Sequence, residues 1–296
     1  MNVLISPYTE HYMNCYLNNL YSIACSCDNN YKLLSYQNEF SYAIIKNKLH
    51  FDYTDDFYLL IYNAIYKLNH NQKFDILKFP LGEKKKVDLK LLKDIPEYIE
   101  SKQILFIMTD LFKFNNGNVF YSKIHREHYL LILGYNQDTN EFVVLDDGNK
   151  GYGIYNIEYN NFFLLIDQNT ADGYVMDVSK IILPNKTELN HANIKNNANR
   201  LINEIKYIIH ELFQIPCPTN YSEYCDFLIF VQRCFNRHIS NKCLLGHLNS
   251  DNNIALGESL FDINKKLTSN WYNIRARMLK NTLAGEKIQY DEIFKK

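Results

Sequence analysis

The sequence predicts an α+β protein in which a helix near the N-terminus packs on an antiparallel sheet and a helical region follows. Apolar residues in segment 14–24 recur at the spacing of an amphipathic helix. Short apolar runs bounded by turn residues are typical of buried strands, at residues 103–109, 128–134 and 142–145. After residue 185 helical spacing returns. We therefore expect two domains, residues 1–185 and residues 186–296, with the second packed on the first.

Turn and breaker residues define the remaining elements. The segment 136–140 separates two of the strands with Asn, Gln, Asp and Thr, which favour a hairpin. Pro216 and Pro218 end a helix that precedes them. We expect a strand from residue 151, a short helix at 158–166, a strand at 173–183, and helices at 193–213, 221–237 and 258–283.

The composition excludes several classes of protein. The 296 residues are 47 % apolar and 15 % aromatic, and the net charge of −1 argues against a nucleic-acid binder. No run of 18 apolar residues and no basic leader occurs, so we expect a cytosolic protein without a membrane-spanning helix. The seven cysteines are odd in number and lack zinc-ligand spacing, which predicts free thiols and no metal site.

Three residues are spaced for nucleophilic catalysis. Cys15 falls in the first turn of the predicted N-terminal helix, where unpaired N–H groups and the helix dipole lower the pKa of a thiol. His128 begins an apolar strand and can take the thiol proton. Asp146 ends the next strand, and a hairpin brings the two strand ends together. Each signal alone is more often structural, and only their order along the chain favours a Cys-His-Asp triad.

The acid of the triad has two candidates, Asp146 and its neighbour Asp147. Side chains alternate between the two faces of a strand, so only one of the two carboxylates can face His128. We favour Asp146.

The chain resembles papain-like, C39-type cysteine peptidases in the order Cys15, His128, Asp146. Its local motifs are closer to the butirosin-biosynthesis H-type acyltransferases of that papain-like group. The matching features are an early Cys that opens a helix, a strand that ends in Asp110, the pair His125 and His128 before an apolar strand and Gly-Tyr, and a strand that ends in Asp146. The resemblance extends in order over most of the chain, including the helical C-terminal part.

The resemblance implies a papain-like fold and an amide-forming acyltransferase or amide synthetase of thiotemplated natural-product biosynthesis. An acyl or peptidyl group would pass from a carrier-protein thioester to Cys15 and then to an amine. The implied partners are an acyl- or peptidyl-carrier protein and a small amine or diamine, without nucleic acid or membrane. No cofactor is expected, because the thioester arrives activated. Arg275, Arg277 and Lys280 are candidates for docking an acidic carrier, although each also suits a solvated helix face.

The oxyanion donor departs from the family pattern. Papain-like peptidases usually place a Gln five or six residues before the Cys, where this chain has Glu10 and Thr9. Candidate donors are the Cys15 backbone N–H with Asn14 or His11, although both side chains also suit helix capping.

Asp110 and His125 are candidates for lining the pocket or for a structural role. Two other functions are compatible with the same residues. One is a cysteine peptidase or thioesterase, in which water accepts the acyl group. The other is a non-catalytic binding module that keeps the papain-like shell.

Overall fold

The structure is a computed structural model that describes residues 5–36, 40–45, 48–53, 83–86, 89–115, 118–148, 150–165, 172–177, 190–211, 218–250 and 258–284. The chain divides into two compact units. The first consists of Met1–Lys32 and Tyr62–Lys186, and the second of Leu33–Ile61 and Thr187–Lys296. The predicted boundary after residue 185 lies beside the junction at Lys186. Residues 33–61, which we placed in the first domain, group with the helices of the second unit instead.

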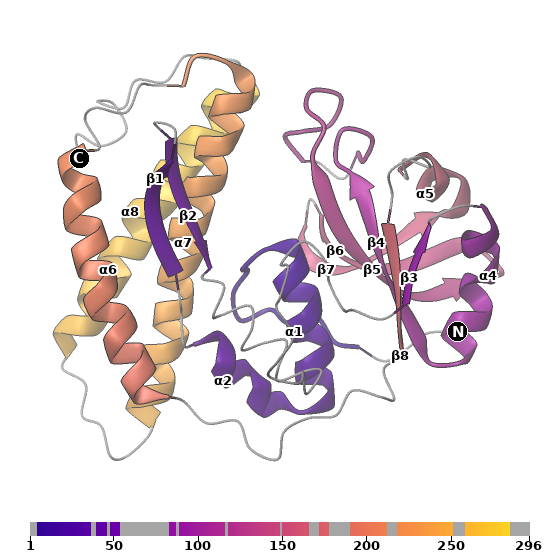
Figure 1. The fold of residues 1–296 in the computed structure, drawn as a ribbon, viewed down its shortest axis with the longest axis horizontal. Helices are drawn as coiled ribbons and strands as arrows, with labels where there is room; N and C mark the ends of the chain where they lie inside the picture. Colours follow the sequence, from indigo (N-terminus) through magenta and orange to yellow (C-terminus); the bar gives the residue numbers. More distant parts are fainter. Residues whose placement is uncertain are drawn as a thin grey trace. The chain divides into compact units, whose positions relative to one another are not determined.

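A six-stranded sheet forms the centre of the first unit, and all of its strand pairs are antiparallel (Figure 1). Its strand order is β3-β8-β4-β5-β6-β7. The strands are β3 (Glu83–Lys86), β4 (Gln103–Asp110), β5 (Glu127–Asn136), β6 (Glu141–Gly148), β7 (Gly151–Glu158) and β8 (Asp172–Asp177).

Helices cover both faces of this sheet. The N-terminal helix α1 (Cys15–Cys27) packs against β5 and β6. The helices α4 (Leu89–Glu100) and α5 (Tyr159–Leu165) share a buried cluster with alternate residues of the strands, such as Leu105 and Ile107 of β4. Phe106 lies between those two residues and contacts Tyr16 of α1, with ring centroids 5.8 Å apart. Because successive side chains of a strand point to opposite faces, α1 covers the face opposite to α4 and α5.

The second unit combines a hairpin with three long helices. The hairpin pairs β1 (Phe40–Ile45) with β2 (Lys48–Tyr53), and the helices are α6 (His191–Glu211), α7 (Tyr221–Ser250) and α8 (Glu258–Ala284). The strand β1 packs on α6, β2 packs on α7, and α7 packs on α8. The short η1 (Asn29–Tyr31) and α2 (Lys32–Ser35) connect α1 to the hairpin.

Charged residues of α6 and α7 hold the hairpin in this unit. The Tyr42 backbone N–H donates to Glu204 Oε2 at 2.9 Å, and the Arg200 guanidinium donates to the Phe40 carbonyl. The Arg237 guanidinium lies 5.2 Å from the ring centroid of Phe40, a cation–π contact. These contacts are the physical reason why residues 33–61 group with the helices.

The α+β class is confirmed, with an N-terminal helix on an antiparallel sheet and helices in the C-terminal part. The predicted strands and helices are present with shifted ends, and α7 is longer than predicted, because it continues to Ser250. Pro216 and residues 178–183 of the predicted last strand lie outside the described residues. The elements β1, β2, β3 and α4 were not predicted.

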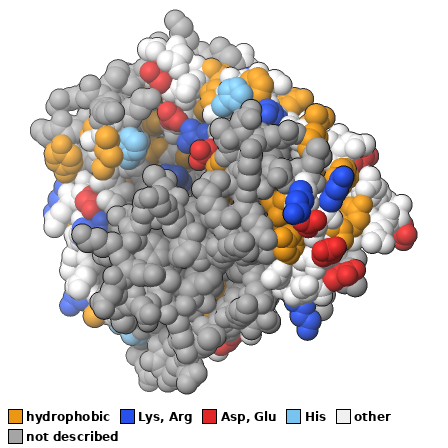
Figure 2. Space-filling model, turned by 45° about the vertical axis from the view of Figure 1, so that its right-hand side comes forward, with side chains coloured by type: hydrophobic (Ala, Val, Ile, Leu, Met, Phe, Trp, Pro, Cys, Tyr) orange, Lys and Arg blue, Asp and Glu red, His pale blue; other side chains and the backbone are white. Residues whose placement is uncertain are grey.

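On the face that Figure 2 shows, acidic and basic side chains of the described residues are interspersed. The chain as a whole carries nearly equal numbers of both, with a net charge of −1. Among the helices that the structure describes, none is long and apolar enough to cross a membrane.

Candidate active site

Cys15 is the first residue of α1, and the residue before it sets the start of the helix. Asn14 has an extended backbone, with φ −157° and ψ 167°, and its Oδ1 accepts a hydrogen bond from the Leu17 N–H at 2.8 Å. This is the N-cap geometry that Asn favours. The thiol therefore lies at the positive end of the helix dipole, which stabilises a thiolate.

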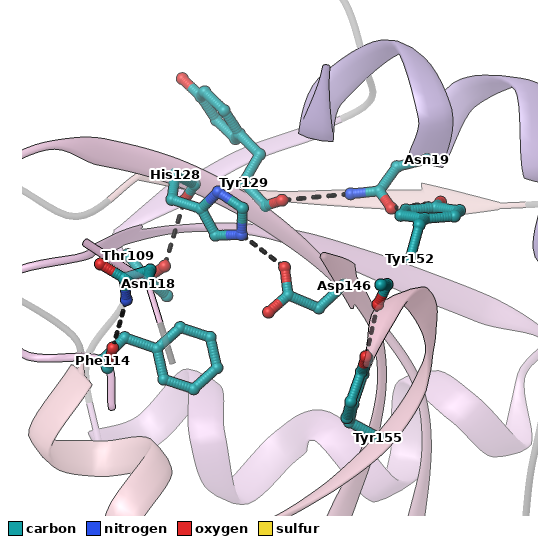
Figure 3. Close-up of polar contacts among 10 residues, drawn as sticks. Asn19, Thr109, Phe114, Asn118, His128, Tyr129, Asp146, Tyr152 and Tyr155 are labelled. Atoms are coloured by element: carbon teal, nitrogen blue, oxygen red, sulfur yellow. Dashed lines mark hydrogen bonds and ion pairs between the residues drawn. The ribbon is translucent and has the colours of Figure 1, made fainter. Parts of the chain in front are cut away.

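His128 and Asp146 come together across two neighbouring strands. His128 lies near the start of β5 and Asp146 near the end of β6. The register pairs Leu131 with Leu145, which sets the two side chains diagonally on one face of the sheet. His128 Nε2 and Asp146 Oδ1 share a short hydrogen bond, and both side chains are buried (Figure 3). The carboxylate thereby fixes the orientation of the imidazole.

The Cys15 thiol forms a hydrogen bond with the same imidazole. Burial raises the pKa of Cys15, but the charge of His128, its hydrogen bond and the Tyr129 backbone N–H hold that pKa below its usual value. Burial lowers the pKa of His128, but the charges of Asp146 and Cys15 raise it well above its usual value. Both directions favour a thiolate–imidazolium pair, the reactive form of a cysteine nucleophile.

Asp147 faces the other side of the sheet from Asp146. It is directly opposite Tyr152 in the register of β6 and β7, and its carboxylate accepts a hydrogen bond from Tyr12. The rings of Tyr12 and Tyr152 lie 6.0 Å apart. Burial and the charge of Asp147 raise the pKa of Tyr12 well above its usual value, so the phenol stays protonated. The structure thus places Asp146 against His128 and Asp147 against the segment that leads into α1.

A network of buried polar side chains anchors α1 to the sheet. Asn19 Nδ2 donates to the Tyr129 carbonyl of β5 at 3.2 Å, and the Tyr152 hydroxyl donates to Asn19 Oδ1 at 2.8 Å. In Figure 3 the Asn19 side chain extends from α1 toward the Tyr129 carbonyl, with Tyr152 beside it. Ser22 Oγ accepts from the Tyr8 N–H at 2.8 Å and lies 3.0 Å from the Tyr152 hydroxyl. The network fixes the helix that carries Cys15 relative to the strand that carries His128.

Sequence reasoning missed Tyr12, Asn19 and Tyr152. For Asn19 a weak signal exists, because an amide amid the apolar positions of a buried helix needs partners. For the two tyrosines there is no local signal, because their partners depend on the strand register.

His11 lies in the core before α1. It is 5 % exposed, and its Nδ1 lies 3.2 Å from the Tyr8 hydroxyl. Burial lowers the pKa of His11 to about 3, so the ring is neutral. Its carbonyl accepts from Asn18 Nδ2 at 3.3 Å, while Asn18 Oδ1 accepts from the Met13 N–H at 2.6 Å. These bonds order the segment that leads to Cys15. Asn14, the other oxyanion candidate, uses its Oδ1 as the helix cap.

The residues at the expected position of the family's Gln are exposed. Glu10 forms an ion pair with Lys32 at 3.6 Å, and Thr9 also lies at the surface. The first hydrogen bond within the helix runs from the Asn18 N–H to the Asn14 carbonyl at 2.9 Å. The Cys15 N–H precedes this ladder and is therefore suited to serve as an oxyanion donor.

Asp110 and His125 form a pair at the end of β4. His125 Nδ1 lies 2.5 Å from Asp110 Oδ2, and its exposed ring stacks on Phe112 at 4.2 Å. Asp110 Oδ1 accepts from the backbone N–H groups of Phe112 and Arg126 at 3.0 and 3.1 Å. Burial raises the pKa of Asp110, but these hydrogen bonds outweigh it and hold the pKa below its usual value. The pair therefore links the end of β4 to the residues just before β5.

No family model matches the chain, and no curated protein matches it significantly in sequence. In the residues that the structure describes, no group of three or more His, Cys, Asp or Glu side chains could hold a metal ion. The geometry around Cys15 is therefore the main basis for a functional interpretation.

Proposed function

We propose that this protein is a papain-like cysteine acyltransferase that forms amides. The observation that carries the proposal is the contact of His128 with both Cys15 and Asp146, at the N-terminus of a helix packed on an antiparallel sheet. This arrangement supplies a nucleophile, a base and an orienting acid. The acyl donor is an acyl- or peptidyl-carrier thioester, and the acceptor is a small amine or diamine.

The first half-reaction transfers the acyl group to the enzyme. The Cys15 thiolate attacks the thioester carbonyl, and the Cys15 N–H stabilises the oxyanion. The intermediate collapses, the bond to the carrier sulfur breaks, and His128 gives its proton to the departing thiolate. The products are an acyl-Cys15 thioester, a free carrier thiol and a neutral imidazole.

The second half-reaction forms the amide. A neutral amine attacks the acyl-Cys15 carbonyl, and His128 takes a proton from its nitrogen. The bond between the acyl carbon and Cys15 sulfur breaks, which restores the thiolate–imidazolium pair. Asp146 orients His128 in both halves. Each step conserves protons and electrons, so the residues of the site suffice without a cofactor.

The aromatic surroundings of Cys15 support transfer to an amine over hydrolysis. Cys15 is half-buried, and burial together with the nearby charge of Cys15 raises the pKa values of Tyr12 and Tyr152, whose rings lie 6.0 Å apart. Aromatic walls limit the water that can reach an acyl-enzyme. A thioesterase or peptidase would use the same three residues, and the acceptor distinguishes these enzymes from a transferase.

Intact-protein mass spectrometry with acyl-loaded carrier proteins tests the proposal. We expect an acyl adduct on the wild-type protein and on Cys25→Ala, and none on Cys15→Ala. Addition of a diamine should discharge the adduct as an amide. Discharge to the free acid whatever amine is present would reassign the protein as a hydrolase. No adduct, together with a Cys15 that resists alkylation, would leave a non-catalytic binding module.

A further inference from the structure

A surface groove runs between α7 and α8 of the second unit, with a volume of about 500 Å³. Its lining residues lie on one face of each helix, at Phe235, Ile239, Lys242, Phe261, Asn264, Lys265, Thr268, Ser269 and Tyr272. From Phe261 to Tyr272 the groove follows α8 for roughly 16 Å, at 1.5 Å per residue. This length equals about three turns of a partner helix.

The floor of the groove is aromatic and accessible. The rings of Phe235 and Tyr272 lie 6.0 Å apart, and Tyr272 is 54 % exposed. Accessible aromatic side chains gathered in a groove are typical of a protein-binding surface, where Tyr and Phe contribute much of the binding energy.

The rim of the groove is basic. Lys242 and Lys265 line it with exposed side chains, and the Arg275 guanidinium lies over the Phe235 ring at 5.6 Å. None of the lining residues is acidic. An apolar floor with cations on both helices is complementary to a partner whose apolar side chains are flanked by carboxylates.

We propose that this groove docks an acidic amphipathic helix of the carrier protein that delivers the acyl group. The proposal rests on the proposed function, because that function requires a protein donor. Of the three basic residues that the sequence suggested for this role, Arg275 borders the groove. Lys242 and Lys265 contribute the other positive charges of the groove.

The test compares two acyl donors that differ only in the protein. Acylation of Cys15 is measured with an acyl-loaded carrier protein and with the same acyl group on pantetheine. For Lys242→Glu/Lys265→Glu we expect the ratio of the carrier rate to the pantetheine rate to fall at least tenfold, and its salt dependence to weaken. The matched control is Lys195→Glu/Lys266→Glu, which makes the same charge change at exposed positions of α6 and α8 that do not line the groove. It should keep the wild-type ratio.

A second variant tests the apolar floor. Tyr272→Ala should lower the same ratio by about tenfold, because an interface aromatic is lost. Tyr272 is exposed, so the fold should tolerate this change. An unchanged ratio in both groove variants would overturn the docking proposal while leaving the acyltransferase intact.

Direct binding separates failure of docking from failure of catalysis. Interferometry with unloaded carrier proteins and the Cys15→Ala protein should show affinity that the two groove lysines control, even if no acyl adduct ever forms. Equal binding by wild-type and groove variants would contradict the proposal. Analytical ultracentrifugation supplies the other outcome: a wild-type dimer that Tyr272→Ala dissociates would identify a second copy of this chain as the occupant.

Discussion

The α1–sheet junction and the helix α7 both bury polar side chains, but they satisfy them differently. In the junction, Asn18, Asn19 and Ser22 are fully buried and each side chain has hydrogen-bond partners, whereas His11 Nε2 in the segment before α1 has none in the described structure. In α7, the buried atoms Asn236 Nδ2 and His238 Nδ1 have no hydrogen-bond partner in the described structure.

The difference indicates where the fold has to be unique. A satisfied buried network rigidifies its surroundings, whereas an unpartnered buried donor only costs free energy. The junction has to hold a thiol, an imidazole and a carboxylate within hydrogen-bond reach of one another. The α7 core has to bring helices together, and apolar packing such as that of Phe227 and Phe230 suffices there.

Loss of the acid from the junction should have the largest effect. Asp146→Asn removes the charge that holds His128 protonated, so the thiolate fraction of Cys15 at neutral pH falls. We expect acyl-enzyme formation to slow roughly 100-fold or more. The control is Asp147→Asn, which lies on the other face of β6 and should have a smaller effect. Stopped-flow kinetics measure acyl-enzyme formation in both variants. A slower rate in Asp147→Asn than in Asp146→Asn would contradict the assignment of Asp146 as the acid of the triad.

Thiol reactivity should separate Cys15 from Cys25 on the same helix. Burial raises the pKa of Cys25 to about 12, while the pKa of Cys15 lies below its usual value. At pH 7 the alkylation of Cys15 by iodoacetamide should exceed that of Cys25 by more than about 100-fold. The Cys15 rate should fall as the pH drops through its pKa, because the thiolate is then protonated. Peptide mapping by mass spectrometry measures both rates, and equal rates would exclude an activated nucleophile.

Exchanging one amide in each region tests the comparison itself. Asn19→Leu leaves the Tyr129 carbonyl and the Tyr152 hydroxyl without that partner, and we expect a loss of about 2 kcal/mol in the free energy of unfolding. Asn236→Leu removes the unpartnered Nδ2 donor and the hydrogen bond that Asn236 Oδ1 accepts from Gln232. We expect the free energy of unfolding to change by less than about 0.5 kcal/mol.

Trp271 allows the two units to be followed separately in urea. It is the single tryptophan of the sequence and lies in α8, so its fluorescence reports the second unit, while far-ultraviolet circular dichroism reports both. Asn19→Leu should shift the circular dichroism transition more than the fluorescence transition. A larger loss from Asn236→Leu than from Asn19→Leu would overturn the contrast between the regions.

A smaller loss of stability than that of Asn19→Leu is expected at the end of β6. A Cβ on Gly148 would lie 2.6 Å from Cζ of Tyr155, so Gly148→Ala has to displace that ring and its hydrogen bond to the Gly151 carbonyl. We expect a cost of about 1 kcal/mol, measured as a lower Tm. Gly153→Ala is the matched control, since a Cβ there meets nothing within 4 Å. Equal Tm values for the two variants would contradict the close approach.

The central strands were predictable because both faces of the sheet are covered, which makes β4, β5 and β6 read as apolar runs. The edge strand β3 was not, because its sequence is Glu-Lys-Lys-Lys and carries no apolar signal. The positions of Cys15, His128 and Asp146 could be read from the start of a helix, the start of a strand and the end of the next strand. The roles of Tyr12 and Tyr152 could not, because they follow from which residues the register places opposite Asp147.

During synthesis, β1 and β2 leave the ribosome long before α6 and α7 exist. A two-stranded hairpin is marginally stable in water, so Phe40 stays without its cover until the helices arrive. The last described strand of the six-stranded sheet ends at Asp177, so Cys15, His128 and Asp146 are all synthesised before α6. Cys15 can thus lie beside His128 in the nascent chain while the second unit is still incomplete and the hairpin still lacks the helices that cover it.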